Sequence, residues 1–331
     1  MDEIERAREV IRTLWADFAP TVPFWVKFSG GKDSTLLLQL TLAVAAENRF
    51  RRIIFVEFND TRLDFPCKYS LIKGLIPRIS SVHPNVSFLV TSPPPERTLF
   101  SFILGRGYNA PDWMFRYCTK ELKVTPSRKR QRAAADEFGG LLTLSGERKE
   151  ESGKRLRRLT EQGAPDGLKL ERRRPSPIFT ASPIADVSTE SVWKYLEKQG
   201  RFIWGETVEE LRELYLQNGK IGANQRDGCW CCTVAAESKF SDQETPRGRI
   251  RNFLRLINDD PRRRCLAITD RQKKRLEEGK ASGRLTLEAR KEFYNFIKEQ
   301  EKEAGERFLS PEEESFIFDC WKKEEEKETE E

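Results

Sequence analysis

A glycine-rich turn near the start of this 331-residue sequence has residue types suited to binding phosphate. The turn FSGGKDS, residues 28–34, lies between the apolar runs 24–26 and 35–38. Glycines let a backbone approach an anion closely, and a helix N-terminus presents unpaired N–H groups to it. Two serine hydroxyls and the ammonium of Lys32 add donors for phosphate oxygens. The turn does not have the GxxxxGK[ST] spacing of P-loop nucleotidases, so we predict a phosphate site of another type.

The seven cysteines offer a second kind of chemistry. Cys229 and Cys232 form a C-x-x-C pair with Cys231 between them, and this spacing bends two thiolates toward one metal centre. A zinc site held by cysteines, or buried thiols without a metal, are open alternatives to an iron–sulfur site. His83 is the only histidine, so catalysis by a Ser-His-Asp or Cys-His arrangement is not expected unless His83 itself serves.

Alternating elements must position these residues. We expect helices at about 2–18, 33–47, 67–78 and 119–137, and strands at 23–28, 52–58, 87–91 and 141–145. Strands that alternate with helices predict a doubly wound, mainly parallel α/β sheet, in which ligands bind beyond the carboxyl ends of the strands. The turn 28–34 follows the first of these strands.

The second half reads differently. After a basic loop we expect a short extended piece, a helix capped by Ser188 or Thr189, and further helices at about 206–217, 246–258, 285–301 and 311–322. We therefore expect a nucleotide-binding domain over 1–200, a helical, cysteine-containing region over 201–323, and a disordered acidic tail over 324–331.

Composition limits the partners and the compartment. Hydrophobic residues make up 37% and charged residues 34% of the chain, with a net charge of +6. No apolar run approaches a membrane span and no signal peptide is recognisable, so we expect a cytoplasmic protein without a membrane partner. Residues 148–174 carry ten Lys or Arg against five acids, and residues 247–274 carry ten against three. Such segments suit a nucleic acid, although a solvated charged surface would read the same way.

The turn SGGKDS resembles the PP-loop of the ATP pyrophosphatases, which cleave ATP between the α and β phosphates. Four further stretches resemble the branch of phosphoadenosine phosphosulfate (PAPS) reductases: FVEFNDTRLDFP (55–66), RYCTKELKVTP (116–126), SGERKEESGKR (145–155) and SPIADVSTESVWKYL (182–196). GCWCCTV, TLEARKEFYNFIKEQ and LSPEEESFIFDCW resemble the DndC family of DNA phosphorothioation systems. The C-terminal catalytic cysteine tail of a PAPS reductase has no counterpart here.

This resemblance implies a set of site residues. It places ATP on Phe28, Ser29, Gly30, Gly31, Lys32, Asp33, Ser34, Asp60, Thr61, Gly146 and Arg148. Lys32, Asp33 and Arg148 would be catalytic, with Asp33 either helping to bind Mg²⁺ or capping the helix. Cys118, Cys229, Cys232 and Cys265 would hold a [4Fe–4S] cluster, while Cys320 packs on a helix face.

The activity implied is that of an ATP pyrophosphatase-type sulfurtransferase, which adenylylates its substrate for sulfur incorporation. DNA is expected as substrate ahead of tRNA, with a sulfur donor such as a cysteine desulfurase and other subunits of a modification system as partners. The alternatives are a PAPS or adenylyl sulfate reductase, a tRNA thiolation enzyme, and a non-enzymatic nucleotide-binding subunit.

Overall fold

The computed structural model describes residues 2–112, 115–171, 176–217, 220–221, 229–233, 244–257 and 283–330. The chain forms two compact units. The first, here the sheet unit, comprises Met1–Asn59, Pro66–Thr91 and Ser127–Asp227. The second, here the helical unit, comprises Asp60–Phe65, Ser92–Pro126 and Gly228–Glu331. A single boundary after residue 200 does not describe this division, because two early segments of the chain belong to the helical unit.

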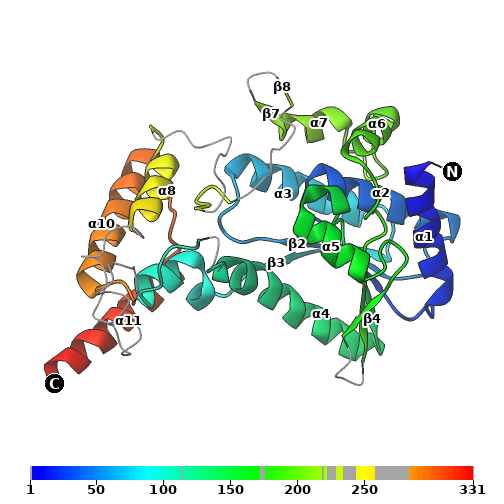
Figure 1. Ribbon diagram of the computed structural model, residues 1–331. Coiled ribbons are helices and arrows are strands. Elements are labelled where there is room, and N and C mark those ends of the chain that lie inside the picture. Colours follow the sequence, from blue (N-terminus) through cyan, green and yellow to red (C-terminus); the bar gives the residue numbers. More distant parts are fainter. Residues whose placement is uncertain are drawn as a thin grey trace. The chain divides into compact units, whose positions relative to one another are not determined.

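The sheet unit is built on six strands in the order β3-β2-β1-β4-β6-β5. Strands β2, β3 and β4 are labelled in Figure 1. The strands are β1 (Phe24–Lys27), β2 (Ile54–Asn59), β3 (Val86–Thr91), β4 (Leu141–Leu144), β5 (Lys169–Glu171) and β6 (Ile178–Ala181). All neighbours pair in parallel except β5, which runs antiparallel to β6 at the edge. The predicted α/β fold with a mainly parallel sheet is confirmed.

Side chains of β1 alternate between two cores, which explains why both faces of the sheet are covered. Phe24 and Val26 belong to a large apolar core that also contains buried residues of α1 (Glu3–Asp17), α2 (Lys32–Glu47), α3 (Pro66–Ser80) and α6 (Thr189–Gln199). Trp25 faces the other way and packs with Ala134 and Ala135 of α4 (Thr125–Phe138). Since successive strand residues point to opposite faces, one apolar run supplies both cores.

Local capping explains where several helices of the sheet unit begin. Ser188 caps α6, as one of the two expected residues, by accepting a hydrogen bond from the backbone N–H of Ser191. The helix α5 (Gly153–Glu161) lies in a stretch that we expected to be a loop. Ser152 caps it, and the pair Arg157–Glu161 stabilises it across one turn. The sheet unit also contains three short elements, α7 (Val208–Glu213), β7 (Leu216–Gln217) and β8 (Lys220–Ile221).

The helical unit has its own apolar core. Its main helices are α8 (Pro246–Ile257), α10 (Leu287–Ala304) and α11 (Pro311–Glu330), and π-helical turns cover Ser101–Gly105 and Thr119–Val124. Phe293 and Ile297 of α10 pack against Ile250 and Leu254 of α8 in this core. Among the described residues, no helix has the length and apolarity needed to cross a membrane.

The acidic end of the chain is helical, contrary to the expected disordered tail at 324–331. Helix α11 continues to Glu330. Its last turns are tied to α10 by ion pairs from Arg290 to Glu324 and from Lys291 to Glu325. The buried Arg290 side chain also donates to the carbonyl of Gly105 over 2.9 Å. A run of acids extends the helix here because cations on the neighbouring helix neutralise it.

Candidate phosphate-binding site

The glycine-rich turn lies at the carboxyl end of β1, as expected, and leads directly into α2. Gly30 has a φ of +76°, a conformation that favours glycine. A Cβ at Gly31 would lie 2.8 Å from the hydroxyl oxygen of Tyr215, so a larger residue would clash there. The helix α2 has Gly31 at its N-cap and no side-chain cap bond. Asp33 therefore does not cap the helix, which was one of the two roles that we considered for it.

The two serines of the turn hold its shape. The Ser34 hydroxyl donates to the carbonyl of Gly31 over 2.8 Å and accepts from the backbone N–H of Ser29 over 3.1 Å. The Ser29 and Ser34 hydroxyl oxygens also lie 3.1 Å apart. The hydroxyls of Ser29 and Ser34 thus stabilise the turn, and both belong to the segment that would contact an anion.

Lys32 and Asp33 form a partly buried ion pair that is fastened by Arg148. The ammonium of Lys32 lies 2.8 Å from Asp33 Oδ2, and Arg148 Nε donates to Asp33 Oδ1 over 2.7 Å. The Arg148 guanidinium also donates to Glu150, to the Val187 carbonyl and to the Thr189 hydroxyl. Only 3% of the Arg148 side chain is exposed. In this structure Arg148 therefore acts by positioning Asp33.

Gly146 allows the strand β4 to approach the start of α2. A Cβ at this position would lie 3.4 Å from the backbone of Asp33 and Ser34, so this segment lies in close contact with the start of α2. The predicted site residues Gly146 and Arg148 thus lie beside the turn, and their binding of ATP stays a prediction.

Phe28 contributes to the core with its side chain, so only its backbone faces a ligand position. The ring is 2% exposed and packs edge-on against Phe88 and Trp204. The indole N–H of Trp204 donates to Glu206 over 2.8 Å. Burial raises the pKa of Glu206 to about 7, because the ionised carboxylate is poorly solvated there. The titratable carboxyl of Glu206 is therefore linked to Phe28, the first residue of the turn, through Trp204.

Two polar atoms at the neighbouring strand ends lack a partner within the described part of the chain. Asn59 and Thr91 are the last residues of β2 and β3 and stand opposite each other in register. The Asn59 Oδ1 and the Thr91 Oγ1 are buried without a hydrogen bond among the described residues. Unpaired buried oxygens are costly, and they lie at the edge where parallel sheets bind ligands.

Asp60 and Thr61 belong to the helical unit. Asp60 accepts from the backbone N–H of Arg62 over 2.7 Å and so closes a turn. The buried Thr61 hydroxyl donates to Asp64 over 3.1 Å and lies 3.7 Å from the sulfur of Cys229. The structure thus brings Thr61 beside a predicted metal ligand.

Four cysteines lie in one region of the helical unit. The N–H of Cys232 donates to the carbonyl of Cys229 over 3.0 Å, and Arg251 donates to the Cys232 carbonyl over 2.7 Å. Burial raises the pKa of Cys118 and of Cys229, and raises that of Cys231 still further, with neighbouring thiolates adding to each effect. Cys231 is 3% exposed in an apolar environment, which agrees with a packing role.

The thiols have the donor chemistry of an iron–sulfur or zinc site, but the described residues do not complete one. Within them, no three Cys, His, Asp or Glu side chains surround a common point as metal ligands do. Cys265, the fourth predicted ligand, lies outside the described residues. We therefore derive no reaction step through a cluster.

The basic segments are largely neutralised where they are described. In 148–171, Lys149 pairs with Asp186, and Arg158 pairs with Glu147. In 247–257, Arg247 and Arg249 pair with Glu306 and Glu303. The remainder of the second segment lies outside the described residues, so a nucleic-acid partner stays a prediction.

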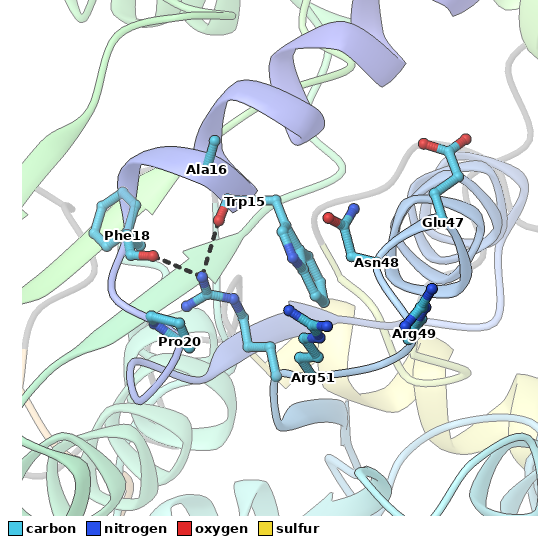
Figure 2. A pocket seen from close by; sticks show the side chains of 9 residues that line it. Trp15, Ala16, Phe18, Pro20, Glu47, Asn48, Arg49 and Arg51 are labelled. Carbon is cyan, nitrogen blue, oxygen red and sulfur yellow. Dashed lines mark hydrogen bonds between the residues drawn. The ribbon is translucent and has the colours of Figure 1, made fainter.

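A cavity of about 380 Å³ lies at the amino-terminal edge of the sheet, at the end opposite to the turn (Figure 2). Its lining includes Trp15, Arg49, Arg51 and Arg52. Arg52 is 2% exposed and donates to the carbonyls of Trp15, Phe18, Ala19 and Val22. Arg52 thus complements the carbonyls at the end of α1 and in the loop that follows it, which explains this buried arginine without a ligand.

Tyr215, Trp204 and Glu206 are site neighbours that sequence reasoning missed. They lie far along the chain from the turn and match no recognised motif. Glu206 and Tyr215 lie in the segment 206–217 that we expected to be an ordinary helix, and Trp204 lies just before it.

The comparisons with known proteins bear on residues 23–235, which match the phosphoadenosine phosphosulfate reductase domain family. No curated protein matches the chain. Among solved structures, the PAPS reductase of Candida auris in a phosphate complex aligns with 17% identity over 65% of this chain and 87% of its own, with a TM-score of 0.39. The FMN adenylyltransferase of Candida glabrata aligns with 13% identity over 66% of this chain and 60% of its own, also with a TM-score of 0.39. The family match spans more than half of the residues and includes the glycine-rich turn, and the chain therefore belongs to the phosphoadenosine phosphosulfate reductase domain family.

Proposed function

We propose that the chain is an ATP pyrophosphatase-type sulfurtransferase that adenylylates an oxygen of its substrate on the glycine-rich turn. The observation that carries this proposal is the turn itself, in which the N-terminus of α2 with its glycine N-cap, Lys32 and two hydroxyls converge after β1. This arrangement suits a phosphate or sulfate group. The family match supports a nucleotide with such a group as ligand.

The proposed reaction has two balanced steps. A substrate oxygen attacks the α-phosphorus of ATP, the bond to the bridging oxygen breaks, and pyrophosphate leaves with the electron pair. A sulfur nucleophile then displaces AMP from the activated position. The N–H groups of the turn and the ammonium of Lys32 stabilise the charge that develops on pyrophosphate. Mg²⁺ bound with ATP would neutralise further phosphate charge, and Asp33 is the one carboxylate of the turn.

The residues beside the turn support an adenine nucleotide rather than a bare phosphate. Asn59 and Thr91 offer two unpaired buried oxygens at the adjacent strand ends. A nucleoside has hydroxyl and amino groups that can donate to them.

A [4Fe–4S] cluster on Cys118, Cys229, Cys232 and Cys265 is part of the proposal. When bound, it would supply iron and sulfide for sulfur chemistry. Anaerobically purified protein should hold about four irons per chain, as one such cluster requires. Loss of iron is expected on Cys229→Ala and not on Cys67→Ala, a matched change at an exposed cysteine. Stoichiometric zinc without iron would support a structural zinc site in place of the cluster.

The test of the activity is pyrophosphate release from ATP in the presence of DNA or tRNA, with AMP measured in parallel. We expect Lys32→Ala to abolish release. Lys198→Ala, at an exposed lysine in the last turn of α6, should leave it unchanged. Sulfite formation from PAPS with a thiol reductant, without pyrophosphate release, would favour the reductase instead. Equal rates in the Lys32→Ala variant would remove the turn from the mechanism.

The choice of DNA over tRNA follows the resemblance to the DndC family. A filter-binding titration with a DNA duplex and a tRNA at several salt concentrations separates the two. Phosphate contacts release counterions, so true binding should weaken steeply with salt. Absence of binding at low salt would leave a small nucleotide or sulfate ester as the substrate.

A further inference from the structure

The N-terminus of α2 is blocked by a tyrosine from a distant part of the chain. The backbone N–H of Lys32 donates to the hydroxyl oxygen of Tyr215 over 2.8 Å. The first residues of helices such as α1 receive this kind of acceptor from their own N-cap, as from Asp2. α2 has a glycine N-cap without a side-chain acceptor, and Tyr215 provides the acceptor instead.

The hydroxyl occupies the position that an anion oxygen would take. A phosphate oxygen accepting from the Lys32 N–H would lie at about 2.9 Å, the usual length of such a bond. One N–H cannot serve both acceptors at full strength, and two oxygens cannot share one position. A Cβ added at Gly31 would lie 2.8 Å from the same tyrosine hydroxyl, so a side chain at position 31 would clash with Tyr215.

Contacts of the ring hold Tyr215 in place. The ring is 7% exposed and meets Trp193 of α6 edge-on, with centroids 5.2 Å apart and planes at 90°. The ammonium of Lys32 lies 6.0 Å from the ring centroid. Tyr215 thus contacts both the backbone and the side chain of the residue to which we assign phosphate binding.

We propose that Tyr215 gates the phosphate-binding turn, so that its hydroxyl must leave the Lys32 N–H before a phosphate oxygen can bind there. This inference rests on the proposed function, since it takes residues 28–34 to be the phosphate site. The free chain then holds the turn closed, and the measured affinity for phosphate is reduced by the fraction of molecules in which the hydroxyl is displaced. Removing the hydroxyl should raise that fraction and tighten binding.

The experiment is calorimetric titration of the full chain with inorganic pyrophosphate. We expect Tyr215→Phe, which keeps the ring but loses the hydrogen bond, to bind about fivefold tighter than the wild type. Tyr215→Ala, which removes the ring as well, should bind at least as tightly as Tyr215→Phe. Tyr195→Phe is the matched control, because the Tyr195 hydroxyl contacts Arg8 at 3.4 Å and not the turn.

The outcomes separate the gate from the proposed function. If wild type and both Tyr215 variants show no binding of pyrophosphate or ATP, the assignment of the turn fails and the gate fails with it. If the wild type binds and both variants bind equally or more weakly while retaining its circular dichroism spectrum, the hydroxyl supports the turn and the gate alone is overturned. Tighter binding in the variants cannot arise from a merely supporting role.

Discussion

Replacing Arg148 by lysine tests whether this residue positions Asp33 or binds the ligand. A lysine keeps the charge and one contact to Asp33 but cannot reach the Val187 carbonyl and the Thr189 hydroxyl together, which now lie 2.9 Å from the guanidinium. Hydrogen bonds from a charged donor contribute about 1.5–3 kcal/mol each to the free energy of unfolding. The bond to the half-exposed Glu150 contributes much less, because solvent screens it. Losing one buried and one part-buried bond, with partial recovery by the lysine, should lower the free energy of unfolding by about 2–4 kcal/mol.

The assay is urea denaturation followed by circular dichroism, with the midpoint and the slope fitted separately. Arg157→Lys is the matched control, because its pair with Glu161 has side chains 84% and 64% exposed. The control should change the free energy of unfolding by less than about 0.5 kcal/mol. An Arg148→Lys variant as stable as the wild type but more than tenfold weaker in pyrophosphate binding would refute the positioning role.

Three further predictions concern stability. Burial raises the pKa of Glu206 to about 7 from 4.5, so its contribution to stability is fully present below about pH 4.5, and about 3 kcal/mol is lost as the pH rises through 7. The variant Glu206→Gln should therefore flatten the dependence of the free energy of unfolding on pH between pH 5 and 8. An unchanged slope would exclude Glu206 as the source of this pH dependence. Arg52→Met removes a buried cation from four carbonyls and should lower the free energy of unfolding, measured by urea denaturation, by about 3–5 kcal/mol. Arg51→Met, at an exposed arginine of the cavity rim, should have little effect. Equal losses of stability in the two variants would contradict the capping role of Arg52. Deleting 324–331 removes the acid that pairs with the buried Arg290 and should destabilise the chain by about 1–3 kcal/mol, whereas a disordered tail would leave the melting temperature unchanged.

The sheet was predictable because its signals are local. Strand β1 and helix α2 are read from two apolar runs separated by a glycine-rich turn, and the alternation of strand and helix then implies parallel pairing. The cap at Ser188 was equally readable, since its side chain bonds to a backbone group three residues away. Each of these features depends on neighbours in the sequence.

The errors arise where distant residues decide the outcome. Residues 324–330 look like a solvated acidic run until Arg290 and Lys291 of α10 are placed beside them. The helix α5 looks like a loop because its apolar content is low, and its stabilising contacts include the Ser152 cap and an ion pair from Arg158 to Glu147. Ion pairs between residues that are distant in the sequence produce no periodic pattern that one sequence could reveal.

The candidate site shows the same division between near and distant information. Residues 28–34 announce a phosphate-binding turn by type alone, yet the state of that turn is set by Tyr215, which is separated from Lys32 by 183 positions. Arg148 likewise looked like a ligand contact, whereas its four acceptors include Asp33 and a backbone carbonyl of the segment before α6. A motif identifies the group that a turn can bind, but the residues packed around it determine which of its donors are available. The affinity of this chain for pyrophosphate should therefore depend on Tyr215, a residue outside the motif, and should tighten when the tyrosine hydroxyl is removed.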